Sequence, residues 1–221
     1  MAERRVLCFG DSNTWGFVPV ETPPSTRFAR AQRWPHVMAA ALGDDMTVIE
    51  EALNGRTTDA ADPLHPQLGG AGLDGSAYLP AALASHLPLD AVVIMLGTND
   101  LKPHFARAPE RIAAGAKRLL DCARILDGGI GTGYPNPRLL LICPPPLGQL
   151  SPHFLPVFAG GVEKSRALSP LYAAAARAAG AAFLDAGTVI TTDGVDGVHV
   201  SAEMQRRLGL AVAEVLRPLL G

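Results

Sequence analysis

The chain has 221 residues and a formal net charge of −2, with 48% hydrophobic and 18% charged residues. This length suits one domain with a sizeable core, and the composition is that of a globular protein rather than a disordered one. A near-neutral charge argues against a nucleic-acid binder, because such proteins usually present a strongly basic face. We therefore expect a single domain, residues 1–221, with no nucleic-acid partner.

The N-terminal segment and the cysteines favour a cytoplasmic protein. Two arginines precede an apolar run, but this run stops at Gly10 and is shorter than the roughly 7–15 apolar residues of a signal peptide. No stretch approaches the ~20 apolar residues of a membrane span. The odd number of cysteines, Cys8, Cys122 and Cys143, does not suggest a disulfide framework. We expect a cytoplasmic location and no membrane contact.

Short apolar runs alternate with helical patterns along the chain. In chain order, strands are predicted at residues 6–9, 47–49, 91–96, 139–143 and 182–184. Helices are predicted at residues 33–42, 78–86, 110–126, 163–179 and from the cap Ser201 to about residue 216. The run at 91–96 is apolar throughout, which is typical of a strand covered on both faces. The alternation predicts an α/β fold: a three-layer α/β/α sandwich around a central, mostly parallel five-stranded sheet.

Two segments are too long and irregular to be simple connections, residues 59–76 and 144–161. The first is rich in glycine, proline and aspartate, and the second is rich in proline. Loops longer than roughly 12–15 residues are usually functional or disordered. We expect both segments to form the rim of a pocket or a contact between subunits.

A serine directly follows the first predicted strand. Ser12 lies between Gly10 and Gly16, which would present its hydroxyl at the carboxyl edge of the sheet, where ligands of parallel sheets bind. A helix after it would direct backbone N–H groups at developing negative charge. Taken alone, the segment is equally consistent with a serine that only caps a helix. A third interpretation is an anion-binding turn, although no G-x-G-x-x-G or Walker pattern is present.

Polar residues also follow the third predicted strand. Asn99 lies two residues after Gly97, and its side-chain amide could donate to an oxyanion. The alternative is an Asx-type turn that only closes the strand. Because both strands end at the same edge of a parallel sheet, Asn99 is expected near Ser12.

An aspartate and a histidine lie three residues apart just before the last predicted helix. Asp196 could accept the Nδ1–H of His199 across a tight turn, which fixes the imidazole tautomer and supports its charge once Nε2 takes a proton. A solvated loop histidine is the alternative. A metal site with Asp193 is less favoured because no third ligand motif is evident. We expect no metal and no organic cofactor.

Together, these segments resemble the four sequence blocks of the SGNH (GDSL-type) hydrolases, over residues 6 to 199. The matching blocks are Gly10-Asp11-Ser12, Gly55 with its neighbours 53–57, Gly97-x-Asn99-Asp100, and Asp196-x-x-His199. The resemblance implies the flavodoxin-like fold of this family. Residues 76–80 and 85–90 are similar to the arylesterase and acyltransferase branch, typified by a mycobacterial acyltransferase. The chain departs from the GDSL pattern at Asn13, where leucine is usual, and this could alter the packing behind the serine.

The resemblance implies a serine esterase that works through an acyl-enzyme. Ser12 would be the nucleophile, His199 the general base and Asp196 the residue that orients it. The oxyanion would be held by the backbone N–H groups of Ser12 and Gly55 and by the side chain of Asn99.

Five further residues are predicted to contact substrate. Trp15 is expected to form a wall of the acyl or alcohol pocket, with packing beneath the loop as an equal alternative. The other four predicted substrate contacts are Asp11, Val198, Phe154 and Phe158. For Val198 and the two phenylalanines, burial in the core or at an interface is the alternative.

The resemblance also implies the substrates and partners. Short-chain esters such as aryl acetates would react with water, or with alcohols or peroxide in acyl transfer, and the chain would form a homo-oligomer. A carbohydrate acetylesterase with the same triad is a second interpretation, and a lysophospholipase or thioesterase is a third. From another class, the chain could be a non-catalytic α/β module that binds an anion at the turn of residues 10–16.

Overall fold

The centre of the fold is a parallel five-stranded sheet in the order β2-β1-β3-β4-β5. The computed structural model describes residues 3–65, 67, 71–124 and 129–221. The strands are β1 (Arg4–Gly10), β2 (Met46–Ala52), β3 (Ala91–Met95), β4 (Arg138–Cys143) and β5 (Ala182–Asp185). Each predicted strand is confirmed, and the predicted parallel sheet is confirmed as well.

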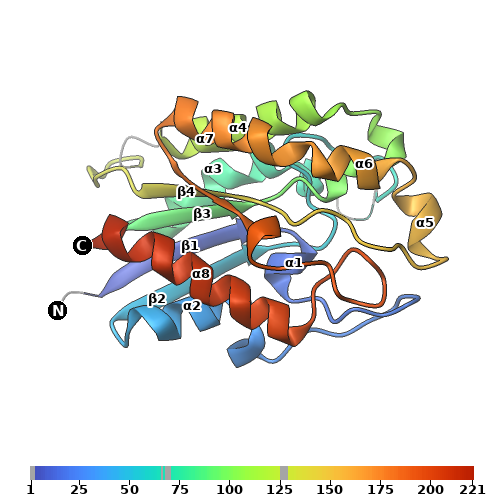
Figure 1. The fold of residues 1–221 in the computed structure, drawn as a ribbon. Coiled ribbons are helices and arrows are strands. Elements are labelled where there is room, and N and C mark those ends of the chain that lie inside the picture. The colour runs from blue at the N-terminus through green and yellow to red at the C-terminus, as the bar shows by residue number, and fades with distance from the viewer. Residues whose placement is uncertain (1–2, 66, 68–70, 125–128) are drawn as a thin grey trace.

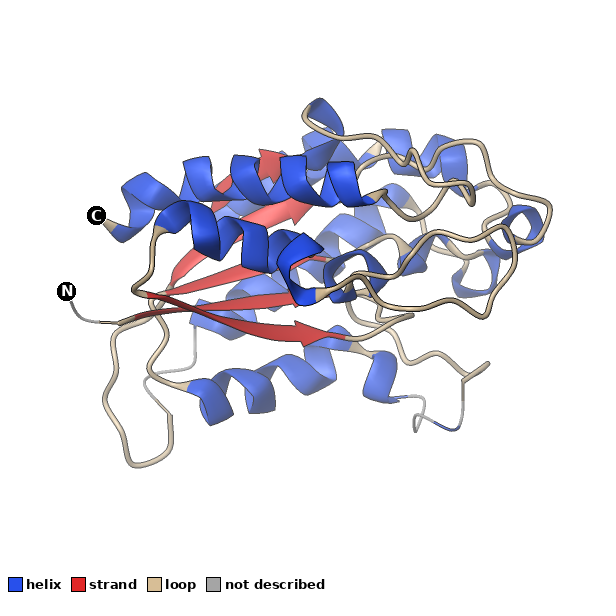
Figure 2. Ribbon diagram, turned by 90° about the horizontal axis from the view of Figure 1, so that it is seen from below, coloured by secondary structure: helices blue, strands red, loops and turns tan. Residues whose placement is uncertain are grey.

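Helices cover both faces of the sheet, as Figures 1 and 2 show. On one face lie α2 (Trp34–Leu42) and α8 (Ala202–Leu220). On the other lie α3 (Gly75–His86), α4 (Pro109–Arg124) and α7 (Leu168–Ala179). The predicted three-layer α/β/α sandwich is therefore confirmed.

Alternation along β1 divides the core between the two faces. Leu7 and Phe9 are buried with α3, α4 and α7, whereas Val6 and Cys8 are buried with α2 and α8. The edge strand β2 is only half-buried along its length, and for this reason its sequence signal is weak. In contrast, all five residues of β3 are buried, as its continuous apolar run predicts.

Short elements gather at the carboxyl edge of the sheet. They are α1 (Ser12–Trp15), α5 (Phe154–Val157) and α6 (Gly161–Arg166), with 3-10 turns at Arg30–Gln32, Ala71–Leu73, Asn99–Leu101, Pro103–Phe105 and Ala186–Thr188. The chain passes from β1 to β2 on one side and then crosses to β3 on the other. This change of direction opens a crevice between the ends of β1 and β3, where ligands of such folds bind.

Two predicted helices differ from the structure. The helix predicted at 163–179 is divided into α6 and α7, with Ala167 between them. Pro170 explains the division, because a proline lacks the N–H that a continuous helix needs and is tolerated only in a first turn. The end of the helix predicted at 110–126 lies outside the described residues, as do residues 66 and 68–70 of the long segment 59–76.

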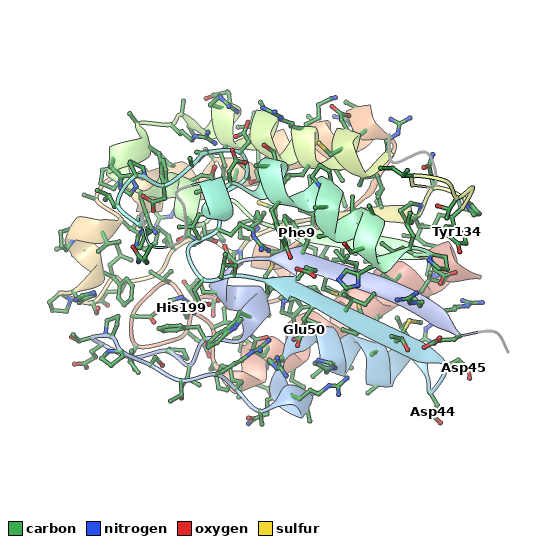
Figure 3. The ribbon with its side chains drawn as sticks, turned by 180° about the vertical axis from the view of Figure 1, so that it is seen from behind. Phe9, Asp44, Asp45, Glu50, Tyr134 and His199 are labelled. Atoms are coloured by element: carbon green, nitrogen blue, oxygen red, sulfur yellow. The ribbon has the colours of Figure 1, made fainter. Side chains whose placement is uncertain are left out.

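Both chain ends lie at the edge of the sheet opposite this crevice (Figures 1 and 2). The Arg4 guanidinium donates to the carbonyl of Gly221, with Nη2 and O 2.6 Å apart. Figure 3 places His199 at the other end of the molecule from Tyr134 and Asp45. Within the described residues, no helix is both long and apolar enough to cross a membrane.

Candidate active site

The serine turn begins where β1 ends. Asp11 caps α1, because its Oδ1 accepts the backbone N–H of Asn13 at 3.0 Å. Gly16 ends the helix with a left-handed φ of 88°, which favours glycine. The turn leaves Ser12 only 7% exposed. The sequence therefore places a nearly buried hydroxyl at the carboxyl edge of the sheet.

Three side chains that are far apart in sequence form a hydrogen-bonded relay. Ser12 Oγ lies 2.9 Å from His199 Nε2, and His199 Nδ1 lies 2.8 Å from Asp196 Oδ2. The other oxygen of Asp196 accepts the backbone N–H groups of Val198 and His199, both at 2.8 Å. With Asp196 as acceptor at Nδ1, the ring is left with Nε2 free to accept the serine proton.

The pKa of Asp196 lies below its usual value. Burial by itself would raise this pKa, but hydrogen bonds from His199 and from the backbone N–H groups outweigh the effect of burial. The carboxylate is fully buried, and it stays ionised at neutral pH. It can therefore stabilise a positive charge on the imidazole.

Two aromatic rings contact the imidazole. Phe17 stacks on His199 with ring centroids 4.2 Å apart and planes at 25°. Phe154 meets the imidazole edge to face, with centroids 5.9 Å apart. These rings restrict rotation of His199 and keep water from it.

Asn13, the departure from the GDSL pattern, joins two parts of the relay. The side-chain Nδ2 of Asn13 donates to the carbonyl of Val198 at 3.2 Å. The backbone carbonyl of Asn13 accepts from Gln205 Nε2 of α8 at 2.8 Å. A leucine could make only the second of these bonds, since that one uses the backbone. The asparagine thus ties the serine turn to the loop that carries His199.

The three residues predicted to supply oxyanion donors, Ser12, Gly55 and Asn99, line one cavity. The backbone N–H groups of Ser12 and Gly55 donate to none of the described residues. Asn99 Nδ2 donates to the carbonyl of Arg56 at 3.1 Å and lies 3.5 Å from Asp11 Oδ2. The bond to Arg56 fixes the orientation of the Asn99 side-chain amide. Because the contact with Asp11 is long, the second hydrogen of Nδ2 can be donated to a stronger acceptor.

A buried charged network supports this set of donors. Thr58 donates to Asp100 from its backbone at 2.9 Å and from its hydroxyl at 2.6 Å. Arg107 Nη1 lies 2.8 Å from Asp100 Oδ1 and 2.6 Å from Asp59 Oδ1, and Arg111 also pairs with Asp59. These bonds fasten the segment after β2, which carries Gly55, to the turn after β3, which carries Asn99.

The relay and the donors open onto one cavity of about 320 Å³. Its lining residues are Ser12, Phe17, Pro23, Asn54, Gly55, His65, Leu73, Asn99, Lys102, Phe154, Val157, Phe158, Val198 and His199. Most of this lining is apolar, with polar groups gathered near the serine. Among the described residues, no group of three or more His, Cys, Asp or Glu side chains could hold a metal ion.

The family model described as GDSL-like Lipase/Acylhydrolase matches residues 8–207. The chain belongs to this GDSL (SGNH) family. It is accordingly a carboxylic ester hydrolase, and the non-catalytic binding module is set aside. No curated protein matches the chain.

Several solved structures resemble the chain over nearly its whole length. A carbohydrate acetylesterase from Sinorhizobium meliloti is 51% identical with a TM-score of 0.93, over 98% of this chain and 99% of that one. An aryl esterase from M. smegmatis is 49% identical with a TM-score of 0.93, over 98% of this chain and 100% of that one. A second carbohydrate acetylesterase family member from S. meliloti is 41% identical with a TM-score of 0.89, over 99% of both.

Two predicted substrate contacts lie outside the cavity lining of this GDSL protein. Trp15 contacts Arg27 instead: the Arg27 guanidinium lies 4.8 Å from the Trp15 ring, and Arg27 Nε donates to the Trp15 carbonyl at 2.6 Å. Asp11 lies behind the serine as the cap of α1, where burial raises its pKa to about 6.

The structure adds lining residues that the sequence did not reveal. Phe17 lies just past Gly16, in a loop without periodic pattern. Lys102 lies three residues after Asn99, and its nearness to that motif was the one available signal. Val157 is on α5 beside the predicted Phe154, inside the proline-rich segment 144–161. That segment was expected at a pocket rim, and the cavity lining includes it.

Proposed function

We propose that the chain hydrolyses short-chain esters, of the acetyl type, through an acyl-enzyme on Ser12. The observation that carries the proposal is the hydrogen-bonded relay from Asp196 through His199 to Ser12, which opens onto a cavity lined by oxyanion donors. This arrangement meets the geometric needs of nucleophilic catalysis by a serine, since nucleophile, base and orienting acid are all within hydrogen-bond reach.

In the proposed mechanism, His199 Nε2 takes the hydroxyl proton as Ser12 Oγ attacks the ester carbonyl. The oxyanion accepts hydrogen bonds from the N–H groups of Ser12 and Gly55 and from Asn99 Nδ2. His199 then gives the proton to the departing alcohol, which leaves the acyl group on Ser12. Water, deprotonated by the same imidazole, releases the acid. Asp196 keeps its charge and holds the ring throughout.

The size and walls of the cavity favour a short acyl group. Phe154 and Phe158 are both buried and Val198 is only 2% exposed, so they form a closed apolar wall near the serine. A volume of about 320 Å³ is at the small end of ligand pockets. Both the lipase-like and the thioesterase interpretation need a longer groove for the acyl chain.

Turnover of p-nitrophenyl acetate, butyrate, octanoate and laurate tests the proposal. We expect activity that falls with chain length and is lost in Ser12→Ala, because the residual rate without the nucleophile is small. Equal release of p-nitrophenol by both proteins would show that Ser12 is not the nucleophile.

A second candidate is the deacetylation of sugars. The similarity to two carbohydrate acetylesterases favours it, and the same residues would do the chemistry. Acetylated xylose and phenyl acetate, compared by kcat/KM, separate the two substrate classes. Adding an alcohol to the same reactions tests acyl transfer, because a new ester would form from the acyl-enzyme.

We also propose a homo-oligomer and a cytoplasmic location. Leu155 of α5 and Val195 of the histidine loop are each 59% exposed, on two of the segments that line the cavity. Large exposed apolar side chains of this kind often mark contacts between subunits. Light scattering after gel filtration tests the oligomer. The three free cysteines support a reducing compartment, which fractionation of the source cells would test.

A further inference from the structure

Lys102 lies in the cavity lining next to the reacting groups. It follows the Asn99–Leu101 turn, and its backbone N–H donates to the carbonyl of Asn99 at 3.2 Å. The residue lines the same cavity as Ser12 and His199, yet it is only 8% exposed. A lysine is rarely buried this far unless its ammonium has a partner.

Within the described chain, the Lys102 ammonium has no hydrogen-bond or ion-pair partner. Among neighbouring charges, Asp62 has the largest effect on the pKa of Lys102, and Asp62 is fully buried. Both oxygens of Asp62 are already engaged: Oδ2 lies 2.9 Å from His65 Nδ1, and Oδ1 lies 3.2 Å from His104 Nε2 and accepts the N–H of Leu64 at 3.0 Å. Asp62 thus stabilises the positive charge of the Lys102 ammonium, while the N–H donors of that ammonium stay free of described partners.

The charges around Lys102 favour an anion in the cavity. Burial lowers the pKa of the Lys102 amine, and the carboxylates of Asp62, Asp11 and Asp100 act in the opposite direction. None of these three acids lines the cavity, since no aspartate or glutamate is among the described lining residues. An incoming anion would therefore meet an ammonium and no facing carboxylate.

We propose that Lys102 determines specificity by binding a carboxylate carried by the ester, so that the preferred substrates are short-chain monoanionic esters. This inference rests on the proposed esterase function. A single ammonium in a small apolar cavity matches one carboxylate in charge and size, and its three N–H donors suit the carboxylate oxygens. The carboxylate can belong to the leaving alcohol or to the acyl group.

Two pairs of substrates show whether the bound carboxylate is on the leaving alcohol or on the acyl group. For the leaving alcohol, 4-acetoxybenzoate is compared with the neutral 4-acetoxybenzamide. For the acyl group, 4-nitrophenyl hydrogen adipate is compared with 4-nitrophenyl adipamate. The measured quantity is the ratio of kcat/KM for the carboxylate over its amide, in the wild type, Lys102→Met and Lys102→Arg.

A matched control is Lys117→Met, which removes an equal charge from α4. Lys117 is 41% exposed and pairs with Asp121, away from the cavity lining. Circular dichroism checks that each variant is folded.

We expect the wild type to prefer the carboxylate in one pair, with a ratio that falls roughly tenfold or more in Lys102→Met. Lys102→Arg should keep much of the preference, and Lys117→Met should keep all of it. A ratio near one in the wild type, or an equal ratio in Lys102→Met, would overturn the inference.

Binding separates this inference from the esterase proposal. If no ester is hydrolysed, the proposed function fails, and calorimetry with 4-hydroxybenzoate and adipate then decides the role of Lys102. Binding to Ser12→Ala at least tenfold tighter than to Ser12→Ala/Lys102→Met would support the carboxylate site. Equal binding, or none to either protein, would refute it.

Discussion

A methyl group at Gly115 should destabilise the protein, although alanine is the better helix former. Gly115 is buried in the middle of α4, against the hydrogen-bonded network of Thr58, Asp59 and Arg107. A Cβ at this position would lie 2.2 Å from Thr58 Oγ1 and 2.6 Å from Asp59 Oδ1. Both contacts are about 1 Å or more shorter than van der Waals contact allows. Gly115→Ala therefore requires one of these side chains to move.

Two opposing terms set the size of the effect. Alanine gains about 1 kcal/mol over glycine inside a helix. Overpacking costs about 1–3 kcal/mol, and each lost hydrogen bond to a charged group costs about 1.5–3 kcal/mol. Thr58 and Asp59 cannot move freely, since they are bound to Asp100 and Arg107. We expect a net loss of about 1–3 kcal/mol in the free energy of unfolding.

Urea unfolding followed by circular dichroism measures this loss, and thermal unfolding should show a decrease of about 2–4 °C per kcal/mol. Gly133→Ala is the control, because nothing lies within 4 Å of its Cβ position. It should change stability by less than about 0.5 kcal/mol. A Gly115→Ala protein as stable as the wild type, or more so, would refute the steric reasoning.

Three other predictions concern single groups. Asn99→Ala should lower kcat by about 10²–10³ if its amide stabilises the oxyanion, and an unchanged kcat would remove it from that role. Tyr172→Phe removes the buried bond from its hydroxyl to the carbonyl of Leu96, 2.9 Å long, and should cost about 1 kcal/mol in urea unfolding, whereas no change would contradict the contact. Because burial raises the pKa of Asp11 from 3.8 to about 6, the native state holds this proton more tightly than the unfolded state. Stability therefore falls as pH rises from about 4 to 6, on the order of 2–3 kcal/mol. Asp11→Asn should lack this contribution, and an identical pH dependence in both proteins would contradict it.

The strands and the sites that follow them could be predicted because the signals are local. The run at β3 is apolar on both faces and ends at Gly97, so its end and the position of Asn99 follow directly. Likewise, β1 ends at Gly10 just before Ser12. Only residues 47–49 were expected of β2, because an edge strand that is half-buried mixes polar and apolar residues.

Side-chain directions in loops could not be predicted in the same way. The contact of Phe17 with His199 depends on how the segment after α1 folds back, and no periodic pattern encodes that path. Trp15 was expected in the pocket, but it is absent from the cavity lining, and its ring contacts the guanidinium of Arg27. Lys102 was missed because a lysine near a motif is usually solvated, and only the packed structure shows that it is buried.

The contact of Arg4 with Gly221 makes a circular permutant a direct test of how far the fold depends on the order of residues in the chain. A short linker could join the start of β1 to the end of α8, which lie side by side in Figure 1. New ends could then be opened beside Gly133, in an exposed loop that Figure 3 shows far from His199, near Tyr134. In such a circular permutant the histidine would precede the serine in the chain, while the sheet would still hold the two side chains together.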